Sequence, residues 1–410
     1  MQFGATAFPV RLLAGRETAD PLDALLMLNH PIKEMARSWA ADLVKPAVDG
    51  MIDRAIWKLA AEAGVQGLLV DEKRGGSGGS AVDAMLVFEG LGSGTDDNGL
   101  TFALASQVFA MQRAFVGSAS DEQLDRWLSA LLAGDAFGSF AMSEPDAGSD
   151  TSTLATLAVE QPDGSYVLNG TKAWVTLGPV CDVAIVFAST DPDKGTWGTT
   201  AFLIDAETPG FLRGPAVEKM GLRSCPFGEL VLTDCRVPAS AVLGRPGSGA
   251  AIFNRTVEAE RLFLYAAQLG AMERVLGRAS EQARTRQQGG RSIGSHQAVS
   301  HRIVDMKVRH EAARLLAYKA AALIDRGEPI GLAAALAKLQ IAENTVESAI
   351  DAMRVFGASG YTVEVGLEAE VRDALGGLAY SGTVDVTRNI VAGLLHLDRP
   401  GRRTKERQTE

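Results

Sequence analysis

The chain has 410 residues, of which 46% are hydrophobic and 22% charged, a composition typical of a folded globular protein. Its formal net charge is -10, which argues against a general nucleic-acid-binding protein, because such proteins carry a basic face. No stretch reaches the roughly 18–20 uninterrupted apolar residues of a membrane span. The opening MQFGATAFPVRLLAG has an Arg inside its apolar patch and does not resemble a secretory signal.

The cysteines and histidines indicate no metal site. The three cysteines, Cys181, Cys225 and Cys235, form no C-x-x-C pair and cannot build a disulfide framework. The five histidines show no metal-ligand spacing. We therefore expect buried thiols, no bound metal and a cytoplasmic protein.

Helical periodicity dominates the chain up to about residue 135. An Asp20-Pro21 pair is a suitable helix start, and Ser120 is a suitable cap for SDEQLDRWLSALLAG. Apolar residues also recur at helical spacing in MIDRAIWKLAAEAGVQGLL. These patterns predict a helical N-terminal domain over residues 1–135.

The period changes to short β-branched runs, such as VAIVFAST and TTAFLIDA, over residues 136–245. Within SYVLNGTKAWVTLG, Asn169-Gly170 predicts a turn between two short strands. Long helical patterns return over residues 246–398 and predict a helical bundle, followed by a polar tail at 399–410. This helix–sheet–helix order, without a G-x-G-x-x-G fingerprint or a P-loop, disfavours a Rossmann domain.

Two segments carry residues that could do chemistry. Phe140–Asp150 reads FAMSEPDAGSD, a tight loop whose backbone N–H groups could hold a phosphate, although an ordinary turn is the more common use of such a loop. On a strand over Lys172–Thr176, Trp174 and Thr176 share one face, where an indole could stack on a flat heterocycle. The alternative is a Trp packed in a β core.

Seven motifs in order resemble the acyl-CoA dehydrogenase family: AMSEPDAGSD, NGTKAWVT, MGLRSCPFGELVLTDCRVPASAVLG, RSIGSHQAVSHRIVDMK, VFGASGYT, VRDA and YSGTVDVTRNIVA. The resemblance implies a mainly α protein with a helical N-terminal domain, a β-barrel-like middle domain and a C-terminal four-helix bundle. It also implies non-covalent FAD and a homotetramer, or a dimer. The substrate implied is an acyl-CoA or acyl-carrier-protein thioester, and the electron acceptor an electron-transferring flavoprotein or a similar protein.

Cofactor residues are carried over from the matching motifs. The resemblance places Met142 and Ser143 at the flavin, Gly148 and Ser149 at the pyrophosphate, and Trp174 with Thr176 over the flavin. The FAD-contacting set as a whole is Phe140, Met142, Ser143, Gly148, Ser149, Trp174, Thr176, Arg286, Gln297, Arg354, Gly357, Ala358, Thr383 and Asp385. Arg286 and Gln297 match positions that reach FAD in a neighbouring subunit.

The chain departs from the family pattern at several of these places. Gly289 and His296 replace aromatic residues, and Arg354 and Ala358 stand where Gln and Gly are common. These changes bear on the cofactor contacts, above all those across a subunit interface. Arg354 could strengthen a pyrophosphate contact as a charged donor.

The usual catalytic base of the family is missing. Many members carry a Glu in Tyr-Glu-Gly-Thr, whereas this chain reads Tyr380-Ser381-Gly382-Thr383. Isovaleryl-CoA and long-chain acyl-CoA dehydrogenases instead carry the Glu before an Arg on the first bundle helix, which matches Glu260 here. The substrate region implied by the resemblance comprises Glu258, Arg261, Tyr380 and Ser381.

The predicted reaction is α,β-dehydrogenation of the thioester, with Glu260 removing the α proton and flavin N5 accepting the β hydride. A Glu beside an Arg on a helix is otherwise usually a solvated ion pair. Two alternative functions remain: a flavin-dependent oxygenase or oxidase on the same scaffold, which needs no carboxylate at 260, and a catalytically degenerate partner subunit.

Overall fold

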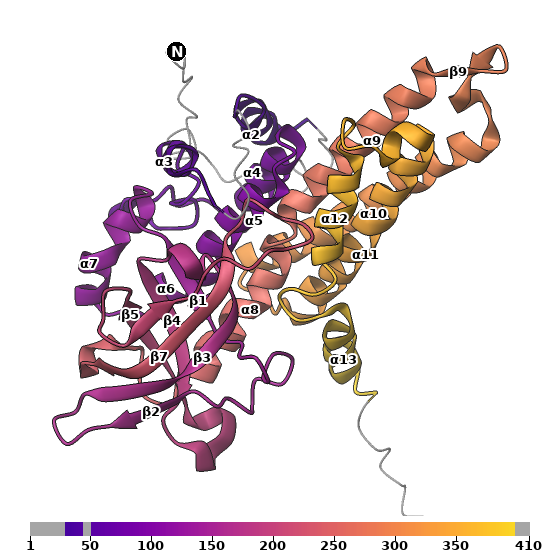
Figure 1. Cartoon of the computed structure of the whole chain (residues 1–410). Coiled ribbons are helices and arrows are strands. Elements are labelled where there is room, and N and C mark those ends of the chain that lie inside the picture. Colours follow the sequence, from indigo (N-terminus) through magenta and orange to yellow (C-terminus); the bar gives the residue numbers. More distant parts are fainter. Residues whose placement is uncertain (1–28, 44–50, 398–410) are drawn as a thin grey trace, which may run out of the picture.

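The computed structural model describes residues 29–43 and 51–397, so the helix start expected at Asp20-Pro21 and the polar tail lie outside it. Helices come first, a sheet follows, and long helices complete the chain (Figure 1). The fold class expected from the sequence is confirmed. No helix of the described residues is long and apolar enough to cross a membrane.

The N-terminal part is built from short helices around a buried apolar centre. Ser120 caps α7 through a capping box with Gln123, as the sequence predicts. A π-helical turn over 107–112 joins α5 to α6. The helices are α2 (Pro31–Ala41), α3 (Arg54–Glu62), α4 (Ala81–Gly94), α5 (Asn98–Ser106), α6 (Arg113–Val116) and α7 (Asp121–Leu132).

The middle part is a sheet of eight strands in the order β6-β7-β3-β2-β4-β5-β8, with β1 added beside β4. Except for the parallel pairs β1–β4 and β2–β4, these neighbours are antiparallel. The strands are β1 (Gly138–Ala141), β2 (Leu157–Glu160), β3 (Tyr166–Thr176), β4 (Val183–Ser189), β5 (Thr199–Asp205), β6 (Phe211–Arg213), β7 (Phe227–Val237) and β8 (Val242–Leu243).

The turn predicted at Asn169-Gly170 is wrong. β3 runs straight through it, because β7 is equally long and pairs with β3 along most of its length. The register shifts between Leu168 and Gly170, so this pair marks a β-bulge. A side chain at Gly170 would collide with Thr156, which explains the glycine without a turn.

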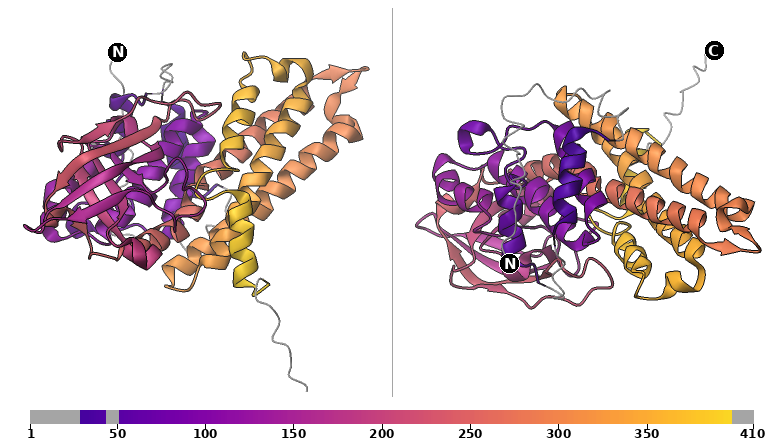
Figure 2. Two further views of the ribbon diagram at one scale, coloured as in Figure 1. Left: turned by 60° about the horizontal axis from the view of Figure 1, so that its bottom comes forward. Right: turned by 90° about the horizontal axis from the view of Figure 1, so that it is seen from above.

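The C-terminal part consists of long helices that run side by side next to the sheet (Figure 2). A hairpin of two short strands, β9 (Gln287–Gln288) and β10 (Arg291–Ser292), joins α9 to α10 at the far tip (Figure 1). The helices are α8 (Gly249–Phe263), α9 (Ala266–Thr285), α10 (Gln297–Asp325), α11 (Gly331–Phe356), α12 (Leu367–Gly376) and α13 (Val384–Leu394).

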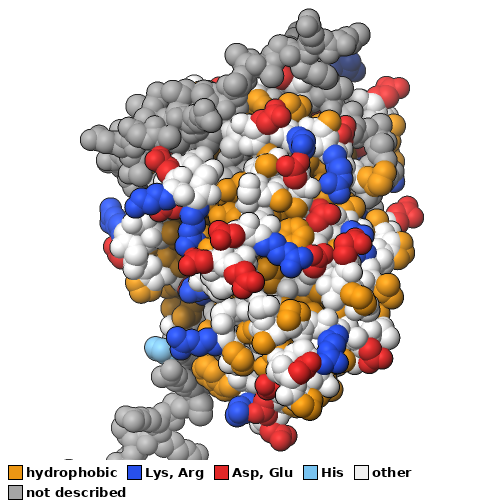
Figure 3. All heavy atoms as spheres, turned by 90° about the vertical axis from the view of Figure 1, so that its left-hand side faces the viewer, with side chains coloured by type: hydrophobic (Ala, Val, Ile, Leu, Met, Phe, Trp, Pro, Cys, Tyr) orange, Lys and Arg blue, Asp and Glu red, His pale blue; other side chains and the backbone are white. Residues whose placement is uncertain are grey.

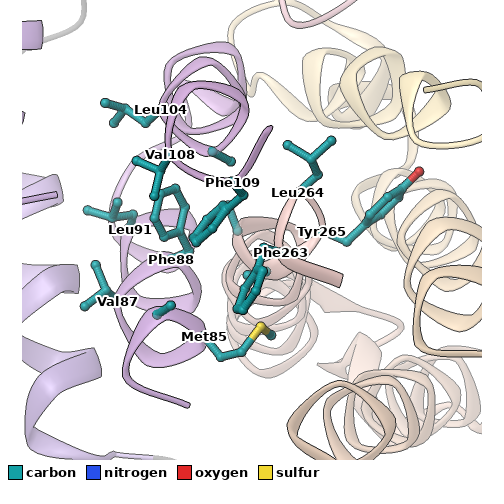
Figure 4. Close-up of a cluster of buried hydrophobic side chains, with 14 of the residues drawn as sticks. Met85, Val87, Phe88, Leu91, Leu104, Val108, Phe109, Phe263, Leu264 and Tyr265 are labelled. Carbon is teal, nitrogen blue, oxygen red and sulfur yellow. The ribbon is translucent and has the colours of Figure 1, made fainter. Parts of the chain in front are cut away.

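The N-terminal and C-terminal helices share one apolar core. In Figure 4, Phe88, Phe109 and Phe263 face one another, and the rings of Phe109 and Phe263 are stacked 4.4 Å apart. The chain breaks its helical run after Phe263, and Tyr265 points away from this cluster toward the C-terminal helices (Figure 4). This break brings both the end of α8 and the start of α9 to the candidate site.

Candidate active site

Glu260 lies in the last turn of α8 and is buried. Burial raises the pKa of its carboxyl to about 7, although Arg261, the Ser381 hydroxyl and Lys338 act in the opposite direction. A surface ion pair would leave this carboxyl in water and its pKa near the ordinary value. The structure therefore contradicts the solvated-helix alternative for Glu260.

The loop carrying Ser381 is held beside Glu260 by a buried lysine. Lys338 of α11 donates from Nζ to the backbone carbonyl oxygens of Tyr380 at 3.2 Å, Ser381 at 2.9 Å and Gly382. Ser381 has a left-handed φ of 54°, which is uncommon for a residue other than glycine and is characteristic of functional loops. The loop is thus fixed in a strained shape next to the carboxyl.

Lys338 was missed by the sequence analysis. The side chain is fully buried, and burial lowers its pKa to about 7, with Arg261 acting in the same direction. The one available signal was a lysine within the otherwise apolar stretch GLAAALAKLQIA. Its partners are about 40 residues further along the chain, and no local pattern links the two segments.

One buried donor near Glu260, Arg261 Nε, has no hydrogen-bond partner among the described residues, whereas the Ser381 hydroxyl acts on the Glu260 carboxyl. Unsatisfied buried donors are costly, so native structures usually reserve them for a ligand or water. Glu258 lies on another side of α8, where its carboxylate approaches Gly331 of α11. The structure thus places Glu260 and Ser381 together and leaves Arg261 between the carboxylates of Glu260 and Glu258, which lie on different sides of α8 as the helical spacing predicts.

An aromatic cluster lies beyond the loop. The Tyr380 ring is 4.5 Å from Phe102 and 4.9 Å from Tyr265. The Tyr265 hydroxyl donates to the carbonyl oxygen of Gly377 at 2.7 Å, and Gln268 Nε2 donates to the Tyr380 hydroxyl at 2.6 Å. These contacts fix the rings beside a small cavity of about 20 Å³ between α5, α9 and α12.

The loop at the end of β1 is organised by Glu144. Its buried carboxylate accepts from Lys172 Nζ at 2.7 Å and from the backbone N–H groups of Ala155 and Thr156. Burial raises the pKa of Glu144, but Lys172 and the hydrogen bonds outweigh burial and hold it below the ordinary value. Lys172 also donates to the carbonyl of Met142, so the predicted loop is rigid at its base.

Trp174 is presented to solvent from β3. It is 57% exposed, has a left-handed φ of 60° at a register shift, and lies 5.7 Å from the Phe227 ring in a stacked arrangement. An indole packed in a β core would be buried, so that alternative is wrong. Thr176 is half-buried at the end of the same strand.

The loop after β1, Trp174 of β3 and the start of α13 have the features needed to bind FAD. The backbone N–H groups of Gly148 and Ser149 are exposed and donate to no other described residue, which suits a pyrophosphate. No atom lies within 4 Å of a side chain built at Gly148, so the backbone there is open to close approach. Trp174 offers a flat apolar face, and Thr383 caps α13 while Asp385 is exposed in its first turn.

The remaining predicted cofactor residues lie elsewhere in the chain. Arg286 and Gln297 flank the β9–β10 hairpin at the far tip of the bundle (Figure 1). Arg354, Gly357 and Ala358 are exposed at the end of α11, with Arg354 paired to Asp351 at 3.2 Å. One copy of the chain does not bring these five residues to Trp174.

Three family models match successive parts of the chain. The acyl-CoA dehydrogenase N-terminal domain matches residues 29–135, the middle domain residues 139–235, and the C-terminal domain residues 247–395.

Individual proteins resemble the chain over most of its length. The L-prolyl-[peptidyl-carrier protein] dehydrogenase of Pseudomonas fluorescens is 41% identical over 83% of this chain and 90% of that protein. The short-chain-specific acyl-CoA dehydrogenase of Megasphaera elsdenii is 35% identical over 84% of this chain and 91% of that protein. The solved structure of PigA with FAD and proline has a TM-score of 0.86 at 35% identity and covers 91% of this chain and 100% of that one.

Proposed function

This chain belongs to the acyl-CoA dehydrogenase family and is an FAD-dependent oxidoreductase of acyl thioesters, and on this premise we propose that Glu260 is its catalytic base and that a small aminoacyl group on a carrier protein is its substrate. The observation that carries the base assignment is the burial of Glu260 beside a loop that has serine in place of the usual Glu.

The reaction needs a base because the C–H bond next to a thioester carbonyl is a weak acid. A carboxylate with a pKa near the working pH combines a useful deprotonated fraction with sufficient basicity. Glu260, with its pKa raised to about 7, has this property. An oxygenase has no need of a carboxylate at this position, so the dehydrogenase is the better-supported function.

The other residues of the site hold and orient the substrate and FAD. Arg261 Nε is a buried donor available to a substrate oxygen, the Ser381 hydroxyl acts on Glu260, and Lys338 keeps the Ser381 loop in place. Trp174, Thr176, Gly148 and Ser149 would hold FAD, together with Phe140, Met142, Ser143, Thr383 and Asp385. Bound FAD supplies the acceptor for the hydride that leaves the β carbon.

Two considerations support a small aminoacyl substrate on a carrier protein. A relative 41% identical to this chain acts on a prolyl group held by a peptidyl carrier protein. The cavity beyond the Ser381 loop is small, about 20 Å³, and is lined by the rings of Phe102 and Tyr380, which favours a compact acyl group over a long alkyl chain. We further propose a cytoplasmic enzyme that assembles as a homotetramer or dimer and passes electrons to an electron-transferring flavoprotein or a similar acceptor.

Replacing Glu260 tests the base assignment. Glu260→Gln keeps the shape and burial of the side chain but removes its basicity, so turnover should fall by roughly 10²–10⁴-fold. Flavin absorbance and melting temperature should stay close to the parent values, which separates a chemical effect from a folding defect. The control Glu281→Gln, at an exposed position of α9, should keep full activity. Parent-level turnover in Glu260→Gln would refute the assignment.

A further inference from the structure

A second pocket, of about 240 Å³, lies where the N-terminal helices meet α8. Its walls come from the segment after α3, from the π-helical turn with α6, and from α8. We call it the α8 pocket, and its lining includes Val70, Val108, Gln112, Arg113, Val116 and Arg255. Arg255 points about 140° away from Glu260 around the α8 axis, and no lining residue belongs to the Glu260 site or to the residues assigned to FAD. The pocket is therefore separate from the catalytic site.

The charge of the α8 pocket is positive, because two arginines and no described Asp or Glu line it, in a chain whose net charge is -10. Arg113 is half-buried, and its guanidinium has no hydrogen-bond or ion-pair partner among the described residues. Arg255 donates from Nη2 to the carbonyl oxygen of Gly117 at 3.1 Å and to Ser118 Oγ at 2.9 Å. Burial lowers the pKa of Arg113 and Arg255 acts in the same direction, whereas Glu258, which does not line the pocket, opposes them. An anion between the two guanidinium groups would stabilise both charges.

Gln112 contributes a buried amide to the same pocket. Its side chain is 1% exposed, and neither Nε2 nor Oε1 has a hydrogen-bond partner in the described part of the chain. Because both ends of the amide are unpaired, turning the amide over would not change this. The other glutamine of the lining, Gln66, donates from Nε2 to the Trp57 carbonyl oxygen at 3.4 Å, so Gln112 is the one with a free amide N–H. An unpaired buried amide costs stability, and native structures usually reserve such a group for a ligand or water.

The size and the apolar part of the lining limit the ligand further. Drug-sized ligands occupy pockets of roughly 300–1,000 Å³, so the α8 pocket suits a smaller molecule. A volume of about 240 Å³ corresponds to about eight waters of the liquid. Val70, Val108 and Val116 stand beside the polar groups and favour an aliphatic portion. The pocket therefore fits a charged group that carries a short branched hydrocarbon.

We propose that the α8 pocket binds a small organic anion, a carboxylate or a phosphate ester with a short aliphatic tail. The anionic group lies between Arg113 and Arg255 and accepts a hydrogen bond from Gln112 Nε2, while the tail contacts the valines. Guanidinium groups suit either anion, because their planar donors match carboxylate and phosphate oxygens alike. This site goes beyond the proposed function, since its ligand is neither the thioester nor FAD and is bound without being transformed.

The test measures binding to the purified holoenzyme by isothermal titration calorimetry. The probes are isovalerate, isobutyl phosphate and isovaleramide, which is the neutral amide with the shape of isovalerate. At least one of the two anions should bind once per chain, and roughly 10-fold or more tightly than the amide, because hydrogen bonds to a charged group are the stronger ones. The anion that binds more tightly identifies the charged group as a carboxylate or a phosphate.

Arg113→Met should weaken binding of the anion by roughly 10-fold or more. It breaks no hydrogen bond of the described residues, so the variant should fold as the parent does. Arg284→Met is the matched control at an exposed arginine of α9 that pairs with Glu281, and it should bind the anion as wild type does. Gln112→Leu should also weaken the anion while its melting temperature stays at or above the parent value, because the substitution removes an unpaired buried amide.

Three results would overturn the site: no binding of either anion, equal affinity for isovalerate and isovaleramide, or wild-type affinity in Arg113→Met. Loss of anion binding in Glu260→Gln would also overturn it, because that result would place the anion at the catalytic site. These titrations involve no turnover. Failure of the anion site would therefore leave the proposed dehydrogenase reaction and its base untouched.

Discussion

A carboxyl and an amine of similar pKa face the same loop at the centre of this site. Glu260 and Lys338 both have pKa values shifted to about 7, and burial is the first cause in each case. Each stabilises the charged form of the other, and Arg261 acts on both. Their titrations are therefore coupled, and the apparent pKa seen in kinetics belongs to the pair.

The rate of substrate-dependent flavin reduction should consequently rise with pH through about 7. Glu260 can take a proton only when deprotonated, and its raised pKa leaves it largely protonated below neutrality. In Lys338→Met the carboxylate loses a nearby cation, so the midpoint should move to higher pH. Stopped-flow reduction across the pH range measures both curves. A rate that stays constant through neutral pH, or a midpoint that moves down in the variant, would contradict this assignment.

Among the elements, α2, α4 and α10 are joined by a buried ionic cluster. Glu89 of α4 contacts Lys33 of α2 at 3.0 Å, Arg314 of α10 at 2.9 Å and the Tyr318 hydroxyl at 2.5 Å. Burial raises the pKa of Glu89, but these partners outweigh burial and hold it below the ordinary value. The cluster connects the N-terminal helices to the bundle. Two of the helices it joins, α4 and α10, pack against α8 and α9.

Removing the charge of Glu89 should destabilise the protein strongly. Glu89→Gln removes the carboxylate that Lys33 and Arg314 share, although Lys33 still contacts Glu273 at 2.8 Å. Breaking such a buried group costs about 3–5 kcal/mol. Urea unfolding should show a loss of this size, whereas Glu281→Gln, in an exposed pair with Arg284, should change stability by less than about 1 kcal/mol. Equal effects of the two substitutions would show that the buried cluster does not hold these helices together.

The sequence predicted elements better than it predicted contacts. Helical periodicity and the cap at Ser120 identified α7, and β-branched runs identified β4 and β5. The Asn169-Gly170 signal failed because pairing with β7, a long-range contact, overrides a local turn preference. For the same reason Lys338 and Gln268 were missed: each acts through residues near 380 that only the fold brings close.

At the scale of the whole molecule, the predicted FAD residues fall into two separated groups. Trp174 and Ser149 belong to the middle domain, and Arg286 and Gln297 to the tip of the bundle (Figure 1). A second copy of the chain would supply the tip residues to the site, as the family resemblance implies. The face over the N-terminal helices and the sheet carries interspersed acidic and basic side chains (Figure 3).

Arg286→Ala should therefore weaken FAD binding. It should not unfold the chain, because the Arg286 side chain is exposed and the residue contributes only backbone hydrogen bonds at the hairpin. Flavin content after gel filtration measures the loss. Mixing subunits of Arg286→Ala with subunits of Trp174→Ala should restore some sites, since a mixed assembly contains one site with neither substitution. Full flavin content in Arg286→Ala would show that Arg286 does not hold FAD.

The most direct test of the central claim is anaerobic flavin reduction by an L-prolyl thioester labelled with deuterium at the α carbon. We predict that wild-type holoenzyme bleaches, that the label slows bleaching, and that Glu260→Gln binds FAD but stays yellow on the same time scale. Bleaching of Glu260→Gln at the wild-type rate would show that another group removes the α proton and would contradict the account.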